Sequence, residues 1–215
     1  MGLDKITILI ILINVMVSYK GFGDRIFFEK YKFQIAPILN GEKIRMLTSG
    51  FLHVDTSHLL FNMLTLYFFA DAVINYVGVP KFLIIYFGSL LAGSLFALSF
   101  HKKEPYYSAV GASGAVMGVV YAAIMLNPGM SLYMFFIPIP IPAYIFGVGY
   151  LLYSIFGMKN RWGNIGHSAH IGGAIGGFLL TIILYPVVVT TNLKMTLLLA
   201  IPIVLMFIFK DKIEG

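Results

Sequence analysis

Long apolar segments constrain the fold of this chain more than any other feature. The stretch from Phe82 to Phe100 contains no charged residue, and over the whole 215-residue chain 59% of residues are hydrophobic and 11% are charged. In soluble domains about a quarter of the residues are charged. The much lower charged fraction of this chain predicts an integral membrane protein. Only helices and closed barrels satisfy their backbone hydrogen bonds in hydrocarbon. The apolar runs lack the alternation of barrel strands, and we therefore expect an all-α, polytopic membrane protein.

The apolar segments divide into six membrane spans and an extra C-terminal one. A helical span needs about 20 mainly apolar residues. The segments lie at about 6–19, 58–76, 82–100, 108 or 111 to 127, 143–158, 167–189 and 195–209. Gly78 and Pro80 separate the second span from the third. Pro138, Pro140 and Pro142 prevent a regular helix before the fifth span begins.

The spans indicate one unit rather than several. No internal repeat is visible in the sequence. We expect a single membrane domain over residues 1–215, with a six-helix core at about 5–190 and an extra helix at about 195–210. The first apolar run follows Lys5 without a small-x-small cleavage site, so we interpret it as a retained span rather than a signal peptide.

The polar residues outside the spans indicate contact with a membrane. Residues 20–57 mix cations with aromatic rings, which is typical of an amphipathic element in the bilayer interface. Thr56 and Ser57 supply hydroxyls that could cap the second span. The net charge of +6 suits anionic headgroups and gives no reason to expect nucleic acid. The absence of cysteine excludes disulfides and thiolate chemistry.

Polar side chains are concentrated at the starts of three alternate spans. His58 and Asn62 share one helix face in the second span, Ser113 begins the fourth, and His170 begins the sixth. Alternate spans of a serpentine chain run in the same direction, so these residues lie toward one membrane face. At a rise of 1.5 Å per residue, Ser113 and His170 would lie roughly 7 to 9 Å below the starts of their segments.

Small residues predict close packing of the fourth and sixth spans. They are Gly114 and Gly118 in the fourth span, and Ala169, Gly173 and Gly177 in the sixth. Such small-xxx-small faces let two backbones touch. Their contact would bring Ser113 within hydrogen-bond reach of His170, which is the geometry of a nucleophile with its general base.

The remaining polar groups predict a dyad with an oxyanion site. Among the carboxylates only Asp71 falls inside an apolar span, and it lies toward the opposite membrane face. We therefore predict a Ser-His dyad without an acidic member. The side chains of His58 and Asn62 and the backbone N–H of Ser113 are the candidate donors to an oxyanion.

Other interpretations of these residues stay open at this point. A serine between glycines in a membrane helix can serve packing alone, and polar groups within spans also occur in transporters. The histidines at 53, 58, 167 and 170 could ligate a metal, although HExxH is missing. We assign no chemistry to three histidines. We expect His53 to brace the first loop, His101 to be an interfacial surface residue, and His167 to cap the sixth helix or face water.

Taken together, the motifs resemble those of the rhomboid intramembrane serine proteases. In chain order they are Arg45, Leu52-His53, His58-Leu-Leu-Phe-Asn62, Gly111-Ala-Ser113-Gly114 and Ala169-His170-Ile-Gly-Gly173. The resemblance covers about residues 45–177. It implies that Ser113 is the nucleophile and His170 the general base, with His58 and Asn62 completing the oxyanion site.

The resemblance also implies a substrate class and supporting parts. The substrates would be transmembrane helices of other membrane proteins, cleaved within the lipid bilayer of the cell membrane without a cofactor or metal. The fifth helix and residues 159–166 would form a lateral gate and a cap. Gly111, Gly114 and Gly173 would permit the close helix packing. Members commonly carry a tyrosine four residues after the serine, packed on the base, where this chain has Met117. A catalytically silent rhomboid-like binder of membrane helices is the alternative, followed by a His-ligated metal-dependent enzyme.

Overall fold

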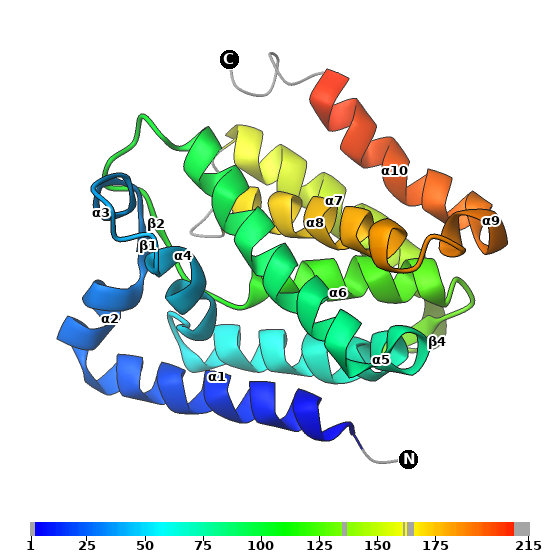
Figure 1. Cartoon of the computed structure of the whole chain (residues 1–215), viewed down its shortest axis with the longest axis horizontal. Coiled ribbons are helices and arrows are strands. Elements are labelled where there is room, and N and C mark those ends of the chain that lie inside the picture. The colour runs from blue at the N-terminus through cyan, green and yellow to red at the C-terminus, as the bar shows by residue number, and fades with distance from the viewer. Residues whose placement is uncertain (1–2, 135–136, 161, 163–165, 209–215) are drawn as a thin grey trace.

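The fold is seen in a computed structural model, which describes residues 3–134, 137–160, 162 and 166–208. It is predominantly helical, as predicted (Figure 1). The helices are α1 (Lys5–Gly23), α2 (Arg25–Tyr31), α3 (Ile35–Leu39), α4 (Arg45–Thr48), η1 (Ser49–Phe51), α5 (Thr56–Phe100), α6 (Ser113–Leu126), α7 (Ala143–Asn160), α8 (His167–Leu184), α9 (Val188–Thr191) and α10 (Leu193–Ile208). The strands are β1 (Phe33–Gln34), β2 (Ser108–Ala109), β3 (Ser131–Met134) and β4 (Ile137–Pro142).

The second and third predicted spans form the two arms of α5. The arms meet at Gly78, whose φ of 77° and ψ of 164° interrupt the helix. This left-handed φ is accessible to glycine at little cost, and Pro80 lies just beyond it. The predicted capping hydroxyls of Thr56 and Ser57 are wrong: the Asp55 carboxylate accepts a hydrogen bond of 2.7 Å from the backbone N–H of His58. Asp55 has the extended backbone that an N-cap requires.

Residues 24–51 fold into short elements on one side of the bundle (Figure 1). Arg45 holds them together from a nearly buried position, since its guanidinium donates to the Glu29 and Lys32 carbonyls and to the Glu42 carboxylate. β1 pairs antiparallel with β2, with Phe33 opposite Ala109. This pairing fixes the segment that leads into α6.

α6 is the central helix of the molecule. All of its residues from Gly114 to Leu126 are buried, and it packs against both α5 and α8. At 14 residues it is about 21 Å long, which is shorter than the roughly 30 Å of a bilayer core. By length α6 is therefore too short to cross a bilayer core by itself.

The predicted start of the fourth span at Ser108 is wrong, and so is the depth derived from it, whereas the alternative start near Gly111 lies two residues before the observed one. Ser113 is the first residue of α6 rather than a residue inside it, because Ser108–Ala109 form β2 and Gly111 adopts a φ of 127°. His170 is the fourth residue of α8, which begins at His167. Both side chains thus lie at helix starts, where backbone N–H groups lack intrahelical partners.

The prolines before α7 exclude helix, as predicted, and they form a hairpin strand that the sequence analysis missed. β4 pairs antiparallel with β3, with Ser131 opposite Pro142 and Leu132 opposite Ile141. Residues at alternate positions of a strand direct their backbone groups to the same edge. The three prolines therefore all lack an N–H on one edge of β4, where no ladder hydrogen bond is needed.

The C-terminal helices differ slightly from the predicted spans. α8 ends at Leu184 rather than near Val189, because Pro186 follows and residues 188–191 form the separate turn α9. α10 lies close to the predicted seventh segment. By length and composition α1, α5 and α8 are candidate membrane spans among the described residues, and α6 and α10 are shorter apolar helices. The chain is a multi-pass membrane protein.

Candidate active site

Direct backbone contact between α6 and α8 builds the site. A Cβ on Gly173 would overlap the backbone of Gly114, and one on Gly177 would overlap the backbone of Gly118. The same face of α8 meets the second arm of α5, where a Cβ on Gly93 would lie 2.6 Å from the Ala169 carbonyl oxygen. Glycine at these positions brings the starts of α6 and α8 together.

Ser113 and His170 form a hydrogen-bonded pair at this junction. The Ser113 Oγ lies 2.6 Å from the His170 Nε2. Ser113 is partly exposed, while the imidazole of His170 is buried. An exposed hydroxyl on a buried imidazole can transfer its proton and attack an electrophile.

The other ring nitrogen of His170 contacts a residue that the sequence analysis did not identify. The Tyr150 hydroxyl on α7 lies 3.2 Å from the His170 Nδ1, and the two rings are 5.5 Å apart at 35°. Met117 is buried in the apolar core. α7 has several tyrosines, and only its packing against α8 shows which one reaches the imidazole.

Gly111 allows the imidazole of His58 to approach the serine. A Cβ on Gly111 would lie 2.7 Å from the His58 Cε1 and 2.9 Å from its Nε2, and the Ser113 Oγ lies 3.6 Å from the same point. The φ of 127° at Gly111 also disfavours any side chain. Asn62 is one turn along α5, where its amide donates to the His58 carbonyl at 3.0 Å. The structure thus brings His58, Ser113 and His170 together and keeps Asn62 beside His58.

His53 packs against this cluster and holds the neighbouring loops, which agrees with its expected role as a brace. It is fully buried, and its Nδ1 lies 2.8 Å from the Ser18 Oγ on α1. Its Nε2 accepts the Ala112 backbone N–H at 3.4 Å, and its ring meets His58 edge-on with the centroids 4.9 Å apart. Burial lowers the His53 pKa to about 3, which keeps Nε2 available as an acceptor. His53 therefore connects α1, the loop before Ser113 and the His58 ring.

Comparison with known proteins identifies the family to which this arrangement belongs. A family model of the Rhomboid domain matches residues 40–187. The chain belongs to the rhomboid family. This rhomboid is 30% identical over 177 residues to RHOMBOID-like protein 12, mitochondrial, of Arabidopsis thaliana, an alignment that covers 75% of this chain and 52% of the relative.

Two further relatives come from yeast and a bacterium. Rhomboid protein 1, mitochondrial, of Saccharomyces cerevisiae is 33% identical over 140 residues, which is 64% of this chain and 40% of the relative. Rhomboid protease GluP of Bacillus subtilis is 36% identical over 143 residues, which is 66% of this chain and 26% of the relative. This rhomboid chain spans about half, or less, of the length of these relatives.

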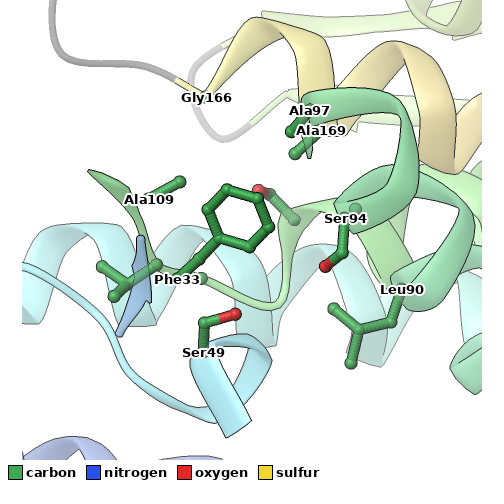
Figure 2. A pocket seen from close by; sticks show the side chains of 12 residues that line it. Phe33, Ser49, Leu90, Ser94, Ala97, Ala109, Gly166 and Ala169 are labelled. Atoms are coloured by element: carbon green, nitrogen blue, oxygen red, sulfur yellow. The ribbon is translucent and has the colours of Figure 1, made fainter. Parts of the chain in front are cut away.

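A small cavity adjoins Ser113 in this rhomboid (Figure 2). Its volume of about 30 Å³ is enough for one or two water molecules. Figure 2 shows Phe33, Ser49, Ser94 and Ala169 around it. The Ser94 hydroxyl donates to the Met46 carbonyl at 2.8 Å. The cavity lies between the 24–51 elements, α5 and the start of α8, so water held there would be next to the serine.

Of the remaining histidines of the rhomboid, His101 lies outside this cluster, and His167 meets His170 edge-on with the ring centroids 6.3 Å apart. His101 is partly buried, stacks on Tyr107 with centroids 3.5 Å apart, and bonds to Ser168 at 3.2 Å. His167 is buried and bonds to the Trp162 carbonyl at 3.1 Å, so its expected role as a cap or a water-facing residue is wrong. The cap position of α8 is Gly166.

The rhomboid structure also shows where the carboxylate of Asp71 lies and bears on the metal-binding alternative. Asp71 lies at the far end of α5's first arm, where it accepts hydrogen bonds of 3.3 Å from the Asp4 backbone N–H and the Thr7 hydroxyl. It is thus remote from the dyad. Within the described ranges, no group of three or more His, Cys, Asp or Glu side chains is arranged to hold a metal ion.

Proposed function

We propose that this rhomboid is an intramembrane serine endopeptidase that cleaves transmembrane helices of other membrane proteins. The observation that carries the proposal is the 2.6 Å contact between the Ser113 Oγ and the His170 Nε2 in a partly buried site. In a low-dielectric, partly enclosed site, a serine paired with an imidazole is suited to acyl transfer. The relative Rhomboid protease GluP is, by its name, a protease.

The roles follow from the positions of the atoms. His170 Nε2 accepts the Ser113 proton as Oγ attacks the scissile carbonyl carbon, and the protonated imidazole then gives this proton to the leaving amine. The resulting acyl-enzyme ester is hydrolysed by water, which His170 activates in the same manner. The cavity beside Ser113 has room for that water.

The negative charge on the carbonyl oxygen needs donors during both steps. Ser113 opens α6, so its backbone N–H is one of the unpaired groups at the positive end of a helix. The His58 imidazole lies against Gly111 beside the serine, and the Asn62 amide has a second N–H beyond the one bonded to the His58 carbonyl. We assign these three groups to the oxyanion site.

A substrate helix must reach this site from the bilayer and unwind there. We assign the lateral gate to α7, whose Phe146 stacks on Phe69 of α5's first arm with centroids 6.3 Å apart. We assign the cap to residues 159–166, of which 161 and 163–165 lie outside the described residues. Substrates with small or helix-weakening residues near the cut are expected, because the scissile carbonyl must leave its helical hydrogen bond.

A serine-directed probe tests the catalytic assignment. We expect a fluorophosphonate to label the wild-type chain in detergent and in liposomes, and to leave the Ser113→Ala and His170→Ala variants unlabelled. Absence of labelling in the wild type would favour the catalytically silent binder of membrane helices. Stoichiometric zinc or iron in the purified protein would favour the metal-dependent alternative.

The membrane that holds the protein is also part of the proposal. We assign it to the cell membrane, although the plant and yeast relatives are named as mitochondrial. Fractionation of the source cells, with detection of the native chain, tests this placement. Recovery in another membrane would overturn it.

A further inference from the structure

Among the residues that the structure describes, no carboxylate bonds to His170, and the outer nitrogen of its imidazole faces a phenol. His170 uses Nε2 for Ser113, and its Nδ1 lies 3.2 Å from the Tyr150 hydroxyl. If His170 is to accept the serine proton at Nε2, the ring hydrogen must be on Nδ1, and that N–H needs an acceptor. The phenolic oxygen of Tyr150 is in the position to accept it.

Tyr150 also restrains the plane of the imidazole. The two rings are 5.5 Å apart and inclined at 35°, so the phenol covers part of one imidazole face. Met117, which occupies the position of the family's tyrosine on α6, has only a weakly accepting thioether. Tyr150 therefore supplies from α7 both the ring contact and an oxygen within hydrogen-bond distance of Nδ1.

The same phenol belongs to a stack of aromatic rings that leads to α5. Phe69 of α5 stacks on Phe146 of α7 with centroids 6.3 Å apart, and Phe146 stacks on Tyr150 at 5.8 Å. Tyr150 then meets His170 of α8. Displacement of α7 from α5 would move Phe146 and Tyr150 as one unit, because they lie one turn apart on the same helix face.

We propose that Tyr150 is the positioning residue of His170. Its hydroxyl oxygen accepts the Nδ1–H hydrogen bond, which fixes the tautomer that leaves Nε2 free to accept the Ser113 proton. The imidazolium formed during catalysis keeps this hydrogen bond, which is stronger when the donor is charged. Because Tyr150 is carried by α7, the base is fully oriented only when α7 is seated against α8. This inference rests on the proposed protease function.

The test compares the hydroxyl of Tyr150 with that of another tyrosine on the same helix. Tyr150→Phe keeps the ring and removes the acceptor. Tyr144→Phe is the matched control, since Tyr144 makes no side-chain hydrogen bond within the described part of the chain. In proteoliposomes with a transmembrane reporter helix, we expect Tyr150→Phe to lower kcat about five- to tenfold, the size of one lost neutral hydrogen bond. KM should stay within about twofold, and Tyr144→Phe should match the wild type.

A spectroscopic readout separates positioning from general structural support and does not require activity. In 15N-histidine-labelled protein, the nitrogen shifts of His170, assigned with the His170→Ala variant, should show a protonated Nδ1 and a bare Nε2. Tyr150→Phe should shift this population toward the other tautomer, while Tyr144→Phe should not.

The outcomes are distinguishable. An unchanged kcat in Tyr150→Phe, a raised KM alone, or a fall in kcat with an unchanged tautomer would overturn the role of Tyr150 and leave the protease assignment standing. A wild-type chain that does not cleave would count against the protease assignment, whereas the nitrogen shifts would still decide whether Tyr150 sets the tautomer.

Discussion

Gly173 of α8 packs directly against the backbone of Gly114 on α6, with no space for a Cβ between them. Ser113 precedes Gly114, and His170 lies one turn before Gly173. The contact therefore sets the separation between hydroxyl and imidazole. The helix packing and the proposed catalysis therefore depend on the same pair of glycines.

Substitution of Gly173 should separate the two helices. Gly173→Ala places a methyl group on the Gly114 carbonyl, and overpacking of this kind costs about 1 to 3 kcal/mol. We expect a lower melting temperature in detergent and loss of serine-probe labelling. Gly149→Ala is the control, because nothing lies within 4 Å of the added Cβ. Equal melting temperatures and labelling for the two variants would contradict the packing account.

His58 should act on the rate rather than on binding. His58→Ala removes an imidazole that lies against Gly111 beside the serine hydroxyl. Loss of one oxyanion donor lowers kcat by about 10²- to 10³-fold in a well-characterised hydrolase, and we expect a fall toward that range with little change in KM. Steady-state kinetics on a reporter helix measure both. A variant with wild-type kcat would remove His58 from the oxyanion site.

His53 should make stability depend on pH. Burial lowers its pKa to about 3 from 6.5, so the unfolded chain binds a proton that the folded chain does not over this interval. The stabilising contribution is present above pH 6.5 and is lost as the pH falls toward 3. We expect His53→Gln to melt below the wild type at pH 7.5, and the difference to narrow as the pH falls through 6. A difference that stays constant over this range would contradict the assignment.

A reversible lock on α7 should stop helix cleavage without disabling the dyad. Phe69 and Phe146 stack across α5 and α7, and the chain contains no cysteine, so Phe69→Cys with Phe146→Cys supplies the two thiols for a single disulfide, whose formation is checked by a gel shift on reduction. The oxidised variant should lose cleavage of a transmembrane reporter yet retain labelling by a small serine probe, and dithiothreitol should restore cleavage. Undiminished cleavage by the oxidised form would show that substrates enter elsewhere.

Much of this arrangement is predictable from sequence because its causes are local. Apolar run length defines the spans, and Gly114 and Gly118 with Gly173 and Gly177 predict the helix contact. The residues at which the helices start were harder to predict. Gly111 with its positive φ and the β1–β2 pairing move the start of α6 to Ser113, and pairing between residues 33 and 109 has no local signal.

The contacts of His53 and Tyr150 could not be predicted from the sequence, because they depend on how distant segments pack together. His53 is one of several histidines, and only the approach of α1 and the 111–112 loop shows that it bonds to Ser18 and the Ala112 N–H. Tyr150 is one of several tyrosines on α7, and its contact with His170 depends on the rotation of α7 about its own axis relative to α8. Apolar helices in a membrane carry weak periodicity, so rotation is not readable from pattern alone.

Cleavage of a transmembrane reporter helix in proteoliposomes tests the central claim most directly. Wild-type protein should produce two fragments whose masses define one main cut within or near the apolar segment. Ser113→Ala and His170→Ala should each abolish these fragments while keeping the wild-type melting transition. Cleavage retained by either folded variant would contradict the Ser113–His170 dyad.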